Sequence, residues 1–107
     1  MPDATFLYVT APDAAVAERI AETLVDERLA ACVNLLPDMR SIYRWEGKVE
    51  RAEEIVMVVK TATDRVAAAS LRIRELHPYT TPCIVALPIA TGNADYLAWI
   101  TAETRLS

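Results

Sequence analysis

The sequence has 107 residues, of which 53% are hydrophobic and only two are glycine. This length and composition suit one compact domain, residues 1–107, with a core of its own. Eleven Lys and Arg residues stand against fifteen Asp and Glu residues, so the formal net charge is -4. Because no general basic surface is available to neutralise phosphates, the composition argues against nucleic acid as a main partner.

The N-terminal segment lacks a positively charged start, and its apolar run is too short for a signal peptide. No stretch approaches the ~20 apolar residues of a membrane span. The two cysteines, Cys32 and Cys83, are too few for a disulfide scaffold, and their spacing matches no CxxC pair. We therefore expect a soluble, cytoplasmic protein with reduced thiols and no membrane partner.

The first predicted elements are a strand and a helix. Residues 5–11 are rich in strand-forming side chains, and Asp13 is a candidate helix N-cap. In residues 13–30, apolar side chains recur every fourth position at Val16, Ile20 and Leu24. This spacing predicts a helix with one buried stripe.

A long hairpin is predicted next. Residues 32–45 have an extended pattern that is interrupted at Pro37, because proline cannot donate to a strand ladder. Glu46 and Gly47 allow a tight turn into a second strand, residues 48–61.

The last three predicted elements are a helix, a short strand and a closing helix. Residues 63–77 carry an apolar helical face, and Pro78 ends that helix. Residues 83–90 form a short apolar strand, and residues 93–105 have apolar side chains at helical spacing.

This order of elements predicts an α+β, ferredoxin-like fold, βαββαβ with an extra C-terminal helix. Right-handed crossovers give a four-stranded antiparallel sheet with two helices on one face. The strand order 4-1-3-2 places the strands that begin at Cys32 and Cys83 at opposite edges of the sheet. An intramolecular disulfide between them is therefore not expected.

The predicted strands are apolar on both faces. In residues 55–59, Ile55, Met57 and Val59 point to one face, and Val56 and Val58 point to the other. Two helices cover only one face. Either the last helix covers the second face, or the sheets of a homo-oligomer pack on one another.

The single histidine and the two cysteines are the candidate metal ligands. His77, at a helix end, either interacts with the last carbonyls or serves as a ligand or acid–base group. Cys32 and Cys83 are either small buried hydrophobes or, with His77, a nitrogen and sulfur set suited to copper or zinc. Such a shared site is expected only between subunits.

Other conspicuous side chains also have two interpretations. Lys60, at the end of an apolar strand, either fixes an anion or extends its ammonium to the sheet edge. Trp45 at the hairpin tip is expected to pack on a partner subunit. The glutamates at positions 50, 53 and 54 are expected to form a solvated face. The sequence has no GxSxG, P-loop or HExxH motif and no partner for a catalytic histidine, so we do not expect an enzyme.

Three segments resemble the CutA divalent-ion tolerance family: "ERLAACVNLLPDMRSIYRWEGKVE", "EEIVMVVKT" and "HPYTTPCIVALPIATGNADYLAWI". The similarity runs along residues 5–105. It implies a homotrimer of ferredoxin-like subunits, similar in architecture to PII signalling proteins. It also implies a role in tolerance of copper and other divalent cations.

The resemblance further implies clefts between subunits, lined by residues that match Cys32, Lys60, Trp45, His77 and Tyr79. Where the family pattern HPYExPE has carboxylates, this chain has Thr80 and Cys83. This difference argues against a hard-cation site, and a thiolate at Cys83 favours Cu(I) or Zn.

The predicted binding residues therefore fall into two sets. Cys32, His77 and Cys83 are the predicted metal ligands, and Trp45, Lys60 and Tyr79 are predicted to contact another bound ligand. The sequence predicts a binding or regulatory protein with weak metal binding. A PII-like sensor of small ligands is the alternative.

Overall fold

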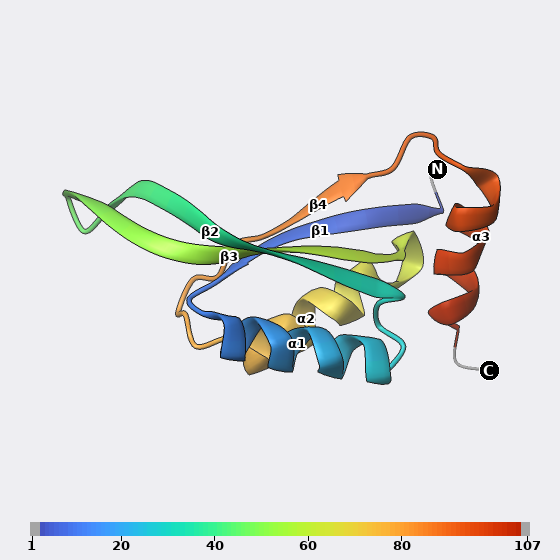
Figure 1. Cartoon of the computed structure of the whole chain (residues 1–107). Helices are drawn as coiled ribbons and strands as arrows, with labels where there is room; N and C mark the ends of the chain where they lie inside the picture. Colours follow the sequence, from blue (N-terminus) through green and yellow to red (C-terminus); the bar gives the residue numbers. More distant parts are fainter. Residues whose placement is uncertain (1–2, 106–107) are drawn as a thin grey trace.

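The computed structural model describes residues 3–105 and shows the predicted α+β architecture (Figure 1). The elements in chain order are β1 (Ala4–Ala11), α1 (Ala14–Asp26), β2 (Cys32–Trp45), β3 (Lys48–Ala62), a 3-10 turn (Thr63–Arg65), α2 (Val66–Leu76), β4 (Ile84–Pro88) and α3 (Ala94–Glu103).

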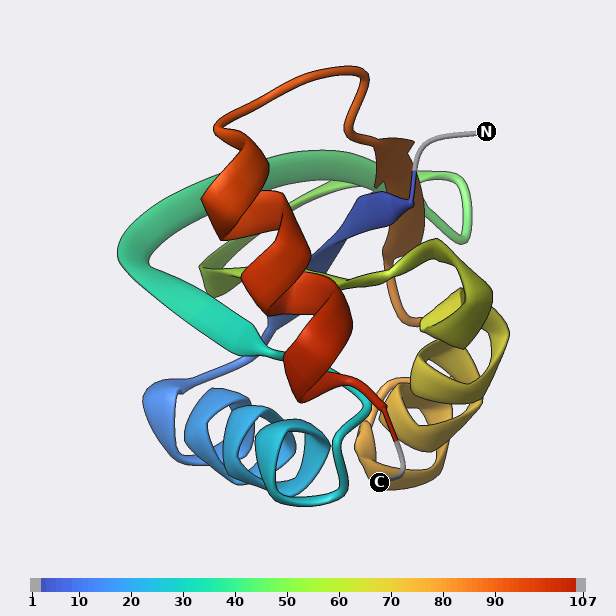
Figure 2. The same ribbon diagram turned by 90° about the vertical axis from the view of Figure 1, so that its right-hand side faces the viewer.

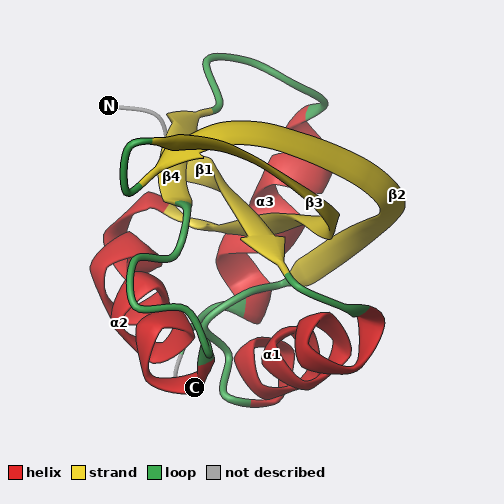
Figure 3. Ribbon diagram, turned by 90° about the vertical axis from the view of Figure 1, so that its left-hand side faces the viewer, coloured by secondary structure: helices red, strands yellow, loops and turns green. Residues whose placement is uncertain are grey.

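Within these residues the sheet has four antiparallel strands in the order β2-β3-β1-β4, which confirms the predicted topology. Helices α1 and α2 lie side by side against one face (Figures 1 and 3). The core between these layers is fully buried and includes Leu7, Val9, Ile20, Leu24, Met57 and Ile73. No helix in residues 3–105 is long and apolar enough to cross a membrane.

Helix α1 ends at Asp26, not at Ala30 as the sequence predicted. Arg28 adopts a left-handed backbone with φ 58°, which stops the helix. The N–H of Leu29 then donates to the carbonyl of Leu24 at 2.8 Å, as in a Schellman cap. The apolar periodicity continued past this point because Leu29 still packs into the core.

Strand β2 continues through Pro37 instead of breaking there, because a β-bulge takes up the irregularity. The pairing with β3 shifts between Leu36 and Met39, and Asp38 has a left-handed φ of 63°. Proline is tolerated at this point because β2 is an edge strand and the proline lies in the bulge. Because β2 has one extra residue here, Tyr43 and Trp45 after the bulge lie on the same face of the sheet as Leu36 before it.

The predicted turn of the hairpin is confirmed at Glu46 and Gly47. Both residues have positive φ, 49° and 79°, as a two-residue hairpin turn of the primed type requires. The hairpin extends well beyond the two helices (Figure 1), and the molecule measures 45 × 25 × 22 Å.

Helix α3 crosses only one end of the second face of the sheet (Figures 1 and 2). At that end Ala4, Ala62 and Ile100 are buried. Farther along the same face, Val85 and Leu87 remain 50% exposed. The last helix therefore covers part of the second face and leaves most of it open.

Candidate functional site

A pocket of about 600 Å³ lies on the open face, where the hairpin, β1 and the segment between α2 and β4 meet. Its aromatic walls are Tyr8, Tyr43, Trp45 and Tyr79. Tyr8 comes from β1, and Tyr43 and Trp45 come from the outer part of β2. The bulge shifts the alternation of β2 by one residue, so both side chains point to the open face of the sheet and not to the helices.

Glu54 on β3 is the acidic group of the pocket. It is 8% exposed, and one of its oxygens accepts a hydrogen bond of 2.9 Å from the Tyr79 hydroxyl. The expected solvated position of Glu54 was therefore wrong. The reason is strand alternation, because Glu54 shares its face with Val56 and Val58.

Two neutral groups of the pocket keep their protons. Burial, followed by the hydrogen bond and negative charge of Glu54, raises the pKa of Tyr79 to about 12. Burial and, to a smaller extent, the charge of Glu54 also raise the pKa of the Cys83 thiol. Cys83 is half-buried and lies one residue before β4, whereas the sequence predicted that it begins the strand.

His77 is buried beneath the pocket and uses both ring nitrogens within the subunit. Nδ1 accepts a hydrogen bond of 3.1 Å from the N–H of Tyr79. Nε2 therefore carries the proton and donates to the carbonyl of Thr10 at 2.8 Å. A role as metal ligand requires one of these bonds to break, so within one subunit His77 acts as a structural residue that holds the Tyr79 segment on β1.

Lys60 and Cys32 lie elsewhere on the same face, directly opposite each other on β3 and β2. Lys60 Nζ donates to the Tyr96 hydroxyl at 2.9 Å and lies 5.8 Å from the centre of the Phe6 ring. Lys60 and Glu54 lie six positions apart on β3, which is about 20 Å along a strand. The predicted site residues thus form two separate groups.

The two cysteines are far apart within the subunit. They belong to opposite edges of the sheet, about 14 Å apart across three strand spacings, and about 13 Å apart along the strand direction. Both thiols are free. The part of the chain that the structure describes contains no group of three or more His, Cys, Asp or Glu side chains placed to hold a metal ion. A site shared by Cys32 and Cys83 between subunits stays a prediction.

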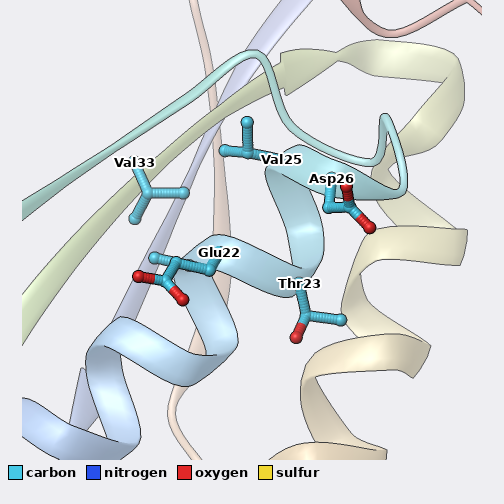
Figure 4. Close-up of a pocket in the computed structure, with 6 residues that line it drawn as sticks. Glu22, Thr23, Val25, Asp26 and Val33 are labelled. Carbon is cyan, nitrogen blue, oxygen red and sulfur yellow. The ribbon is translucent and has the colours of Figure 1, made fainter.

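A second, shallower pocket lies between α1 and the start of β2 (Figure 4). Val25 and Val33 give it an apolar surface, and the carboxylates of Glu22 and Asp26 lie beside it. It is wide open to solvent and combines no set of groups suited to catalysis or metal binding.

Sequence reasoning found Trp45, Tyr79 and Cys83 but missed Glu54, Tyr8 and Tyr43. A signal for Glu54 was present, because positions 54, 56 and 58 alternate onto one face of a strand. Tyr43 lies two residues before Trp45 and so follows the same rule.

Comparisons with known proteins agree with this architecture. The family model "CutA1 divalent ion tolerance protein" matches residues 5–103. The divalent-cation tolerance protein CutA of Thermus thermophilus is 51% identical over 98 residues, which cover 92% of this chain and 95% of the relative. Protein CutA of Homo sapiens is 44% identical over 98 residues, covering 92% of this chain and 55% of the human protein.

Solved structures extend the similarity to three dimensions. The crystal structure of CutA from Xylella fastidiosa has a TM-score of 0.95 and 44% identity, with 96% of this chain and 99% of that chain covered. The periplasmic divalent cation tolerance protein CutA from Archaeoglobus fulgidus has a TM-score of 0.93 and 44% identity, with 95% and 99% covered. The chain therefore belongs to the CutA1 divalent ion tolerance protein family.

Proposed function

We propose that this chain forms a homotrimer that takes part in copper tolerance by binding copper or zinc ions weakly in clefts between its subunits. The observation that supports this proposal most is the open face of the sheet. It exposes apolar side chains, and it has the candidate ligands Cys32 and Cys83 at opposite edges.

The open face favours self-association. Leu36, Val85 and Leu87 are each about half exposed on it, and large exposed apolar areas usually mark interaction surfaces. The outer edges of β2 and β4 are unpaired within the described residues. Contact between two different edges is heterologous, and such contacts form a ring when the rotation between subunits closes. The family resemblance implies that the ring has three members.

The thiols support both the proposed metal preference and the proposed weak binding. Sulfur ligands favour Cu(I) and Zn over hard cations. Because the pKa of the Cys83 thiol is raised, a metal ion must displace its proton to bind there. Binding is therefore expected to be weak at neutral pH and to strengthen as the pH rises. His77 can join the ligands only by giving up one of its two internal hydrogen bonds.

Calorimetric titration with Zn²⁺, and with Cu(I) under reducing conditions, tests this proposal. We expect Cys32→Ser and Cys83→Ser each to weaken binding while the melting temperature changes little. A forced monomer is expected to lose binding as well. Equal affinity in the double-Ser variant would refute a thiol site and leave both cysteines as packing residues.

A PII-like sensor of small ligands is the second candidate, and Lys60 favours it. Among the described residues, its ammonium has no carboxylate partner and donates only to the Tyr96 hydroxyl. Its charge is therefore available to an anionic ligand. Titration with nucleotides and small anions, compared between the wild type and Lys60→Met, separates this function from metal binding.

A cytoplasmic location is also part of the proposal. Two free thiols suit a reducing compartment. The Archaeoglobus fulgidus relative is described as periplasmic, so the location requires a direct measurement. Fractionation of the source cells, with a compartment marker for each fraction, provides it.

A further inference from the structure

The pocket around Glu54 carries an uncompensated negative charge. Among the described residues, the Glu54 carboxylate accepts one hydrogen bond, from the neutral Tyr79 hydroxyl, and makes no ion pair. The side chains that line the pocket within residues 3–105 include no lysine, arginine or histidine. A carboxylate that is about nine-tenths buried is ordinarily paired with a cation, since burying a charge alone is costly.

The walls of the pocket suit one kind of cation. Tyr8, Tyr43, Trp45 and Tyr79 line the same pocket as the carboxylate, and Tyr79 donates a hydrogen bond to it. Aromatic faces attract positive charge through the ring quadrupole, and several such faces together with an acid recognise ammonium groups. The volume of about 600 Å³ leaves room for a small organic molecule.

The same residues are poorly suited to a metal ion. Among the described residues that line the pocket, Glu54 is the one carboxylate and Cys83 is the one thiol. Transition metals need three or four donor atoms, and aromatic rings supply none. Both nitrogens of the nearby His77 are already used.

We propose that this pocket binds a small organic cation, a protonated or quaternary amine, between its aromatic walls and the Glu54 carboxylate. This function is additional to metal binding and does not depend on it. It gives the aromatic side chains Tyr43 and Trp45, which are 43% and 50% exposed in the subunit, a direct ligand to contact.

Choline is a suitable probe, with 3,3-dimethyl-1-butanol as its uncharged counterpart of the same shape. The fluorescence of Trp45 reports binding in a Trp99→Phe background, since Trp99 lies on α3 outside the pocket lining. We expect saturable binding of choline and at least about tenfold weaker binding of the alcohol, because the cation–π and charge terms are absent.

Two matched variants test the role of the carboxylate. Glu54→Gln keeps an oxygen that accepts from Tyr79 but removes the charge, so choline affinity is expected to fall about tenfold. Glu53→Gln is the control, because Glu53 faces the other side of the sheet, opposite Arg40. Equal binding of choline and the alcohol, or unchanged affinity in Glu54→Gln, would overturn the proposal.

A lysine of another copy of the chain is the alternative source of the amine, and Lys60→Met tests it. Choline binding in the wild type identifies a free ligand, whereas binding only in Lys60→Met identifies that lysine of a neighbouring subunit as the bound amine. Absence of binding in both proteins overturns the proposal. Cys32→Ser is expected to keep choline binding and lose thiol-dependent Zn²⁺ binding, because Cys32 lies outside the pocket lining, so either proposal can fail without the other.

Discussion

At the scale of single residues, Tyr79 joins the parts of the pocket. Its hydroxyl donates to Glu54 on β3, and its main-chain N–H donates to the ring of His77, which in turn donates to Thr10 on β1. The ring of Tyr79 also lies 4.7 Å from that of His77. One short segment thus fixes its own position and that of the buried acid.

The raised pKa of Tyr79 makes stability depend on alkaline pH. The usual pKa of tyrosine is 10.0, and the folded protein raises it to about 12, mainly through burial. Because the folded state holds this proton more tightly, its contribution to stability is fully present below about pH 10 and is lost as the pH rises toward 12. We expect the melting temperature of Tyr79→Phe to fall less steeply than that of the wild type over this interval. Parallel curves from circular dichroism would contradict the assignment.

The structural role of His77 predicts a large loss of stability on substitution. His77→Phe removes the bonds to Thr10 and to Tyr79 from a buried position. The free energy of unfolding is expected to fall by about 2 to 4 kcal/mol, measured with urea. Unchanged stability combined with lost Zn²⁺ affinity would instead identify His77 as a ligand.

Which residues would meet at the pocket was only partly predictable. The resemblance and the exposed aromatic pointed to Tyr79 and Trp45. Glu54 was misassigned because a glutamate near a hairpin is usually solvated, and its burial depends on Tyr79, 25 positions away. Contacts of this kind come from tertiary packing, which local periodicity does not report.

At the scale of elements, the bulge in β2 determines which side chains reach the pocket. Cys32 and Leu36 precede it and Tyr43 and Trp45 follow it, yet all lie on one face. The sequence signalled an irregularity at Pro37 but not its form. Alternation of apolar residues predicted the strands well, whereas the end of α1 was misplaced because the left-handed Arg28 is not a glycine.

The left-handed backbone of Asp38 gives a test of the bulge. Asp38→Val places a β-branched side chain at φ 63° and is expected to lower the free energy of unfolding by about 1 to 2 kcal/mol. Asp38→Gly removes the steric conflict and is expected to be neutral or slightly stabilising. Chemical denaturation compares the two, and a greater loss for glycine than for valine would contradict the bulge geometry.

At the scale of the whole molecule, one face of the sheet lacks sufficient cover. The sequence predicted this property, because the strands are apolar on both sides and two helices cover one side. It left open whether α3 or other subunits would complete the packing. In the structure, α3 covers only the end of this face near Ala4 and Ala62. The rest of the face is therefore left for other subunits to cover.

Substitution on the open face tests self-association. Leu87→Lys places a charge at a position that is 50% exposed in the subunit, so we expect the proposed trimer to dissociate at micromolar concentration. Leu71→Lys is the matched control, because Leu71 is 61% exposed on α2, on the opposite side of the molecule. Light scattering measures the mass. A wild-type protein that is mainly monomeric would reject the assembly.

The overhanging hairpin also makes association visible to hydrogen exchange. The outer end of the hairpin extends beyond the helix layer (Figure 1), and Ile42 and Val49 there are 62% and 63% exposed, so pairing between two strands alone protects its amides in a free subunit. When other subunits cover it, deuterium uptake there should slow as protein concentration rises. Uptake in β1, beneath α1 and α2, should stay slow at every concentration. Deuterium uptake by the hairpin thus reports assembly without an attached chemical probe.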